Sequence, residues 1–376
     1  MKIIADSNIL FVEDAFGKFG ELCLYKTKID DKDILKDADV LLCRSTMKID
    51  RGLLEGTGIK FVATATSGTE HFDTDYLKHR NIKYADAKGS NSNSVAEYVT
   101  AALLNLAVKN SFSLKGKSIG IVGYGCVGKI VEKKAQALGL SAFVNDPPLE
   151  DAGEAGNFYP IEKILSCDII TLHVPLTFQG EYRTKNLIGH EAFKRMSKQT
   201  IFINASRGPV VDEDALCEFL KLNSPKYAVI DVWNNEPGIN TGLLDYIDIA
   251  TPHIAGHSLD GKALGTAMIY DEFCRHFNLN DKWDYNKLLP EPEVKEIEMD
   301  EKKSFEEAMN EIVKKVYDIQ NDDLLMREIK NEASAPSHFS RMRSNYKIRR
   351  EFFNTAVACK NEEYSNRIKK LGFKLK

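Results

Sequence analysis

The sequence predicts an α/β protein built from two doubly wound parallel-sheet domains and a small α+β domain at the C-terminus. Three observations support this class. Short apolar runs alternate with helical stretches up to residue 258, a glycine-rich turn joins one of these runs to a helix, and the composition changes after residue 286. We therefore expect three domains: residues 1–94 with 259–285, residues 95–258, and residues 286–376.

The composition is that of an ordinary globular protein. Of 376 residues, 43% are hydrophobic and 28% are charged, and 51 basic side chains against 55 acidic ones give a net charge of −4. Such a chain has no overall electrostatic attraction for nucleic acid or anionic membranes. The seven cysteines lack metal-ligand spacing and Asp6 interrupts any apolar leader, so we expect reduced thiols, no metal and a cytoplasmic protein.

Three strands are expected in the first domain, at residues 2–6, 40–44 and 61–65. Polar or small residues follow each strand, and ligands gather at the carboxyl ends of parallel strands. Ser45 and Thr66 are therefore candidate substrate contacts. The helical stretch 261–278 is expected to return to this domain and to make it discontinuous.

The second domain opens with a helix over residues 94–109, in which Ser94 and Glu97 fit a capping box. Six strands follow, with helical segments mostly between them, at residues 117–122, 142–145, 169–173, 201–205, 227–232 and 247–250. In the third domain the apolar pattern predicts a helix near 305–316, a basic helix at 340–353, a strand at 355–359, a helix at 362–371 and a terminal strand.

A glycine-rich turn, residues 123–128, follows the first strand of the second domain and precedes a helix. In this context Gly123 permits the tight turn, Gly125 lets a pyrophosphate approach the backbone, and Gly128 allows the helix to pack closely on the strand. The amides of Cys126 and Val127 then lie at a helix N-terminus, which favours a phosphate. The pattern predicts a dinucleotide site.

Asp146 ends the next expected strand, 18 residues after Gly128. A carboxylate at this point accepts hydrogen bonds from the adenosine ribose and repels a 2′-phosphate. No Arg or Lys occurs in the following residues 147–150. The cofactor is therefore expected to be NAD rather than NADP.

Arg207, Glu236 and His253 follow three further strands of the same domain. A guanidinium binds a carboxylate in two-point geometry. An imidazole can take a hydroxyl proton while hydride leaves, and a neighbouring carboxylate orients that imidazole. Together the three side chains fit hydride transfer from a 2-hydroxy acid, although each alone also fits an ordinary structural role.

These residues resemble the D-isomer-specific 2-hydroxyacid dehydrogenase family, through segments 123–128, 204–211, 231–237 and 251–256. Further segments resemble the members that oxidise 4-phospho-D-erythronate to (R)-3-hydroxy-2-oxo-4-phosphooxybutanoate in pyridoxal 5′-phosphate biosynthesis. They are residues 44–45, 64–71, 146–148, 253–262, 288–292, 316–318 and 349–351. The resemblance implies a Rossmann NAD domain, a flavodoxin-like substrate domain, a C-terminal dimerisation domain and a homodimer.

The resemblance also implies roles for individual residues. Arg207 would bind the substrate carboxylate and the C2 oxygen, His253 would be the acid/base and Glu236 would tune it. Asp231 would contact the nicotinamide carboxamide, and Ser45 and Thr66 would contact substrate. The other cofactor-lining positions are Ala205, Ser206, Gly256 and Val174. Two positions depart from the family pattern: Val174 replaces a Thr near the cofactor, and His257 replaces a Tyr beside the substrate.

Several alternatives stay open on the sequence. The substrate phosphate could be bound by Arg44, by Lys88 or by the basic run at 341–350. In the last case Arg343 or Arg349 would reach across a dimer interface. A solvated helix face or an interface ion-pair network is the more ordinary explanation of that run. Other functions are a dehydrogenase for 3-phosphoglycerate, glycerate or D-lactate, a non-catalytic NAD sensor, and a nucleic-acid role based only on the basic run.

Overall fold

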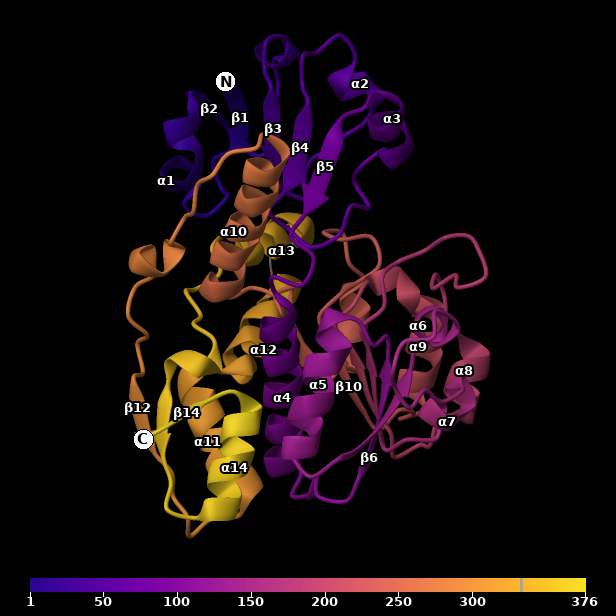
Figure 1. The fold of residues 1–376 in the computed structure, drawn as a ribbon. Coiled ribbons are helices and arrows are strands. Elements are labelled where there is room, and N and C mark those ends of the chain that lie inside the picture. The colour runs from indigo at the N-terminus through magenta and orange to yellow at the C-terminus, as the bar shows by residue number, and fades with distance from the viewer. Residues whose placement is uncertain (332–333) are drawn as a thin grey trace. The chain divides into compact units, whose positions relative to one another are not determined.

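The computed structural model describes residues 1–331 and 334–376, which form two compact units (Figure 1). The first unit comprises Met1–Asn91 and Ser258–Pro290, and the second comprises Ser92–His257 and Glu291–Lys376. The first unit is discontinuous because helix α10 (Leu259–His276) belongs with the N-terminal strands. Residues 291–376 belong to the second unit, and their separation as a third domain stays a prediction. The dimerisation role of that segment stays a prediction.

The first unit contains a five-stranded parallel sheet in the order β2-β1-β3-β4-β5, which is the flavodoxin-like order. Its strands are β1 (Lys2–Asp6), β2 (Glu21–Tyr25), β3 (Val40–Cys43), β4 (Phe61–Thr64) and β5 (Lys83–Asp86). The sequence pattern identified the three inner strands and missed β2 and β5. These two form the edges of the sheet and carry partly exposed residues, so they lack a continuous apolar run.

Four helices accompany this sheet. They are α1 (Val12–Phe16), α2 (Arg51–Leu54), α3 (Thr74–His79) and α10. The buried face of α10, including Tyr270 and Phe273, packs with Ile3 and Phe61 of the sheet in one apolar cluster. Ser258 caps α10 by accepting a hydrogen bond from the Gly261 amide.

The second unit contains a six-stranded parallel sheet in the order β11-β10-β9-β8-β6-β7. Its strands are β6 (Ser118–Val122), β7 (Ser141–Asn145), β8 (Ile169–Leu172), β9 (Ile201–Asn204), β10 (Tyr227–Ile230) and β11 (Ile249–Ala250). The chain passes from β6 to β7 on one side and then returns to place β8 on the other side. The carboxyl ends of β6 and β8 therefore flank the point where strand order reverses, which is where ligands bind in such sheets.

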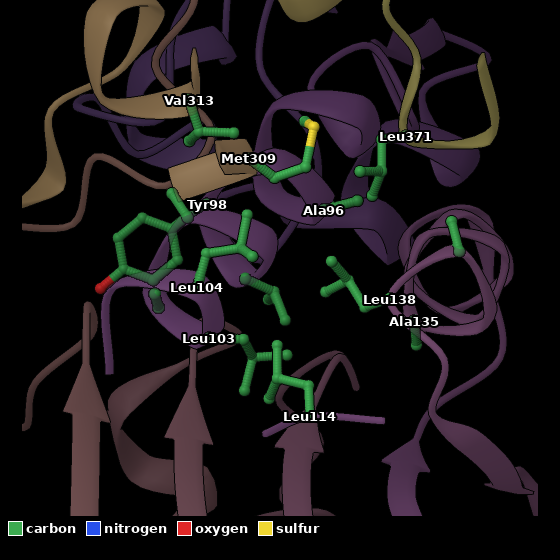
Figure 2. Packing of buried hydrophobic residues seen from close by; sticks show 14 of the residues in the cluster. Ala96, Tyr98, Leu103, Leu104, Leu114, Ala135, Leu138, Met309, Val313 and Leu371 are labelled. Atoms are coloured by element: carbon green, nitrogen blue, oxygen red, sulfur yellow. The ribbon is translucent and has the colours of Figure 1, made fainter. Parts of the chain in front are cut away.

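Helix α4 (Ser92–Lys109) is the centre of the largest apolar cluster in this unit. In Figure 2, Leu103 and Leu114 lie toward the strands, and Met309 and Val313 of α11 (Phe305–Val316) pack on the opposite side. The other helices that precede the C-terminal segment are α5 (Cys126–Ala137), α6 (Pro147–Asp151), α7 (Ile161–Leu165), α8 (His190–Arg195) and α9 (Glu213–Lys221). Because α4 is buried almost all round, nearly every residue along it is apolar or hydrogen-bonded.

The expected capping box of α4 is wrong. The Ser94 hydroxyl donates to Glu351 Oε1 at 2.6 Å, and Glu97 Oε1 accepts from the Asn93 side chain and from the Phe352 amide. The first turn of α4 is thus joined to a distant part of the chain. The local capping box does not form because Ser94 and Glu97 are buried and hydrogen-bond to Glu351 and Phe352 instead.

The C-terminal segment adds α11, α12 (Ile319–Arg327), α13 (Ala335–Ser344), α14 (Glu362–Leu371) and a parallel sheet of β12 (Glu296–Glu298), β13 (Ala356–Ala358) and β14 (Lys374–Leu375). The expected basic helix at 340–353 is wrong, because α13 ends at Ser344. Residues 346–351 are irregular, and Arg349 and Glu351 within them form buried tertiary hydrogen bonds. Among the described residues, no helix is long and apolar enough to cross a membrane.

Candidate active site

The glycine-rich turn lies directly after β6, and α5 begins at Cys126 as expected. Gly123 has φ of +93°, and a Cβ there would lie 2.6 Å from the His173 carbonyl oxygen, so only glycine fits. A Cβ on Gly128 would lie 2.1 Å from the Gly123 oxygen, which explains the close packing of α5. The position of a Cβ on Gly125 is open, and no side chain caps the first turn of α5. These features fit a pyrophosphate at the Cys126 and Val127 amides.

Asp146 stands at the end of β7 and links two backbone segments. Its Oδ2 accepts a hydrogen bond from the Tyr124 amide at 2.7 Å, and its Oδ1 accepts one from the Leu149 amide at 3.2 Å. The carboxylate is thereby held beside the glycine-rich turn. This position fits a ribose contact, which stays a prediction.

Val174 and Ser206 follow the neighbouring strands β8 and β9. A Cβ on Gly123 would lie 3.0 Å from Val174 Cγ1, so Val174 adjoins the glycine-rich turn. Ser206 is buried, and both its amide and its hydroxyl donate to Asn204 Oδ1. Ala205 lies between Asn204 and Ser206 in the chain and is partly buried. Burial lowers the pKa of the adjacent His173 to about 3, so this imidazole stays neutral.

The Arg207 loop packs tightly on the segment that carries Glu236. A Cβ on Gly208 would lie 2.0 Å from the Trp233 carbonyl oxygen, so only glycine permits this approach. The Arg207 carbonyl accepts from the Asn204 amide group at 3.2 Å, and its Nη1 donates to the Ser206 carbonyl at 2.9 Å. The loop is thus fixed from both sides at the end of β9.

Glu236 and His253 form a hydrogen-bonded pair, with Glu236 Oε2 and His253 Nδ1 separated by 2.7 Å. The other carboxylate oxygen accepts from the Trp233 amide at 2.8 Å. Burial raises the pKa of Glu236, but the His253 hydrogen bond and charge, the Trp233 amide and the Arg343 charge together keep it below its ordinary value. Glu236 is therefore ionised at neutral pH and fixes the imidazole, with Nε2 left for a reacting group.

Asp231 holds the loop that carries His253. Its Oδ1 accepts from the Thr251 hydroxyl at 2.6 Å and the Ile254 amide at 2.8 Å, and its Oδ2 accepts from the Ala255 amide at 3.0 Å. His253 itself has φ of +57°, a left-handed conformation that a non-glycine residue adopts at a cost of ~1–3 kcal/mol. These bonds oppose that strain, so Asp231 keeps the loop in shape, whatever contact it makes with a nicotinamide.

Sequence reasoning missed Trp233 and Tyr98. The Trp233 indole donates to the Thr251 carbonyl at 2.9 Å, and its backbone contacts both Gly208 and Glu236, so it joins three strand ends. Its position two residues after Asp231, within the segment 231–237, could have indicated a role at the site. The Tyr98 hydroxyl bonds the Thr251 hydroxyl at 2.8 Å from helix α4, and nothing in the sequence indicates that contact.

Ser45 and Thr66 lie in the first unit, after the neighbouring strands β3 and β4, whereas His257 lies in the second unit. Ser45 is exposed, and the Thr66 hydroxyl bonds the Thr64 hydroxyl at 2.7 Å. The His257 ring meets the Tyr346 ring edge-on, with centroids 5.8 Å apart. Their substrate contacts stay predictions.

One candidate for the substrate phosphate is wrong. Arg349 is 2% exposed and donates to the Ser94 and Ala255 carbonyls at 3.1 Å each, so it cannot reach across an interface. Arg44 Nε donates to Asp6 Oδ2 at 2.9 Å and stays partly exposed. Arg343 stays partly exposed as well, and lies 3.9 Å from Glu236 Oε2.

Comparison with known proteins agrees with this geometry. Residues 80–255 match the family model described as D-isomer specific 2-hydroxyacid dehydrogenase, NAD binding domain, and residues 288–372 match a domain of unknown function. Among solved structures, NAD-bound 3-phosphoglycerate dehydrogenase of Entamoeba histolytica has a TM-score of 0.62 and 25% identity over 76% of this chain and 98% of that one. NAD-bound formate dehydrogenase of Staphylococcus aureus has a TM-score of 0.61, with 24% identity over 76% and 98%.

Curated relatives match essentially the whole chain, whereas the two solved structures cover 76% of it. The erythronate-4-phosphate dehydrogenase of Pseudoalteromonas atlantica is 39% identical over 100% of both chains. That of Serratia proteamaculans is 37% identical over 99% of both. The chain therefore belongs to the erythronate-4-phosphate dehydrogenase family, within the NAD-dependent D-isomer-specific 2-hydroxyacid dehydrogenases.

Proposed function

We propose that the chain oxidises 4-phospho-D-erythronate to (R)-3-hydroxy-2-oxo-4-phosphooxybutanoate with NAD, as a step of pyridoxal 5′-phosphate biosynthesis. The observation that carries the chemistry is the 2.7 Å hydrogen bond between Glu236 and His253, in the same unit as the glycine-rich turn. The substrate follows from the full-length similarity to relatives of that name.

In this mechanism the Arg207 guanidinium binds the substrate carboxylate and the C2 oxygen. His253 Nε2 accepts the proton of the C2 hydroxyl, while the C2 hydrogen leaves with its electron pair. The resulting imidazolium is stabilised by the ionised Glu236 through Nδ1. In the reverse direction the same imidazolium returns the proton to the carbonyl oxygen, so one residue serves as base and acid.

NAD, when bound, would supply the nicotinamide ring as the hydride acceptor. The Cys126 and Val127 amides, with Gly123, Gly125 and Gly128, are proposed to hold the pyrophosphate. Asp146 is proposed to bind the adenosine ribose. The remaining proposed contacts are Asp231 at the carboxamide, and Val174, Ala205, Ser206, Arg207 and Gly256 along the cofactor. Ser45, Thr66 and His257 are proposed to contact the substrate.

The test is an assay of NADH formation by the purified chain. We expect turnover with 4-phospho-D-erythronate to exceed that with 3-phosphoglycerate, glycerate or D-lactate, and His253→Ala to abolish it. Preference for 3-phosphoglycerate would support another dehydrogenase of the family. No turnover with any of the four acids, combined with tight NADH binding, would support a non-catalytic sensor instead.

We also propose a cytoplasmic homodimer. Among the described residues of the C-terminal segment, the large apolar side chains Leu324, Leu325, Ile348 and Phe353 are exposed in the single chain. Exposed apolar side chains that come together in a patch mark interaction surfaces, and two-fold dimers are the commonest assemblies. Analytical ultracentrifugation should give twice the chain mass for the wild type, and a smaller particle for Leu324→Glu with Leu325→Glu.

A further inference from the structure

The C-terminal segment contacts the loop that carries His253 and the carboxylate of Glu236. Arg349 donates to the Ala255 carbonyl, Tyr346 meets the His257 ring, and Arg343 Nη1 lies 3.9 Å from Glu236 Oε2. All of these residues belong to the second unit of one chain. The segment that matches a domain of unknown function is therefore adjacent to the candidate active site.

We propose that Arg343 is a positioning residue for the reaction, which shares the Glu236 carboxylate with His253. The oxygen that Arg343 approaches, Oε2, is the one that bonds His253 Nδ1. Both partners are mostly withdrawn from water, with side chains 35% and 17% exposed. The inference rests on the proposed function only in that it assigns His253 as the acid/base.

Arg343 is carried to this place by anchors on both sides of it. Within α13, Phe339 is fully buried in the apolar cluster that also contains Met326 and Ile329. After α13, the Tyr346 hydroxyl donates to Asp322, and Arg349 is buried with its guanidinium 4.2 Å from the Tyr317 ring. The Arg343 guanidinium itself lies 6.0 Å from the Phe339 ring centroid. These anchors hold the backbone on both sides of Arg343 and so keep its side chain within reach of Glu236.

The consequence is electrostatic. A carboxylate near a guanidinium attracts an imidazolium proton less strongly, and the guanidinium also repels the imidazolium directly. The charge of Arg343 is among the causes that lower the pKa of Glu236. The charge of Asp231 also interacts with that of His253, and it favours the imidazolium, in opposition to Arg343. Arg207, a second positive charge, follows the adjacent strand β9. Arg343 thus favours the neutral imidazole, which is the form that accepts a proton from the hydroxy acid.

The test compares pH profiles of kcat/KM for wild type, Arg343→Gln and Arg343→Lys. In the oxidative direction the acid limb should move up by about 0.5–1 pH unit in Arg343→Gln, given a partly exposed charge near 4 Å, and Arg343→Lys should restore most of it. Lys330→Gln removes a charge of the same segment that pairs with Asp245, and should leave the profile unchanged. NMR titration of the His253 imidazole, assigned with His253→Gln, should show the same shift without substrate.

An unchanged acid limb and an unchanged imidazole titration in Arg343→Gln would overturn the inference. A rise in KM for the phosphorylated acid with no shift in either titration would overturn it too, and would assign Arg343 to substrate binding. Absence of wild-type turnover with every acid would refute the proposed function, while the NMR titration would still decide the role of Arg343.

Discussion

Replacing Asp231 by Asn should release the catalytic loop. The side chain is 1% exposed and accepts three hydrogen bonds, two on Oδ1 and one on Oδ2. Asn offers one oxygen, so with that oxygen toward Ile254 its amide group faces the Ala255 N–H. Two donors then oppose each other in a buried site, and the two remaining bonds lose the help of a negative charge.

The size of the effect can be estimated from these bonds. An unsatisfied buried N–H costs ~1–3 kcal/mol, and each remaining bond weakens by ~1 kcal/mol as it changes from charge-assisted to neutral. Burial raises the pKa of Asp231, so removing its charge gives back part of that cost. We expect a net loss of ~2–4 kcal/mol in the free energy of unfolding.

Urea unfolding and steady-state kinetics test this estimate together. A loop free to move takes His253 out of place, so kcat should fall ~10²-fold or more, because misplacing a catalytic group by ~1 Å has that effect. Asp248→Asn is the control, since Asp248 is a less buried aspartate that accepts a hydrogen bond from the Ala228 amide at 2.8 Å, near the other end of β10. Wild-type stability and kcat in Asp231→Asn would refute the reasoning. A raised KM for NAD alone would limit Asp231 to a nicotinamide contact.

The remaining predictions concern three further positions. Gly208→Ala places a Cβ 2.0 Å from the Trp233 carbonyl oxygen. The substitution should therefore lower the free energy of unfolding by at least ~1–3 kcal/mol and also lower kcat/KM. An unchanged thermal midpoint would contradict this prediction. His253→Gln should lower kcat ~10²–10⁴-fold and leave NADH affinity, measured by fluorescence, within about twofold of wild type; a large loss of affinity would contradict it. Burial raises the pKa of Glu97 to about 8. Between about pH 4.5 and 8 the folded chain therefore keeps a proton on Glu97 that the unfolded chain has released. The contribution of this group to the free energy of unfolding falls as the pH rises through this range. Urea midpoints should therefore decline less over this range in Glu97→Gln than in wild type, and equal declines would disprove the assignment.

Much of the architecture could be predicted because its signals are local. Buried parallel strands read as continuous apolar runs, so β1, β3 and β4 and all six strands of the second sheet were identified. The glycine-rich turn carries its own geometric constraint, and its strand and helix lie next to it in the chain. Edge strands β2 and β5 were missed because they carry exposed and partly exposed residues, which interrupt the apolar run.

The candidate site likewise contains residues that local sequence signals indicate and residues that they do not. Arg207, Glu236 and His253 could be predicted as candidates because each lies in the segment that follows a strand, and parallel strands bring their carboxyl ends to one edge. Their roles stay predictions. The ends of the C-terminal helices were less predictable. Helix α13 stops at Ser344 because Arg349 and Glu351 gain buried partners on α4, about 255 residues away in sequence, which no local pattern encodes.

The sequence by itself therefore determined the two parallel sheets, the dinucleotide-binding turn, the preference for NAD and the three side chains of the proposed chemistry. Only the tertiary structure decided that Asp231 supports the His253 loop, that Arg349 is a buried anchor, and that Arg343 lies beside Glu236. The physical reason is the range of the interactions. Backbone turns and apolar periodicity depend on neighbouring residues, whereas buried hydrogen bonds and charge pairs depend on which distant segments pack together.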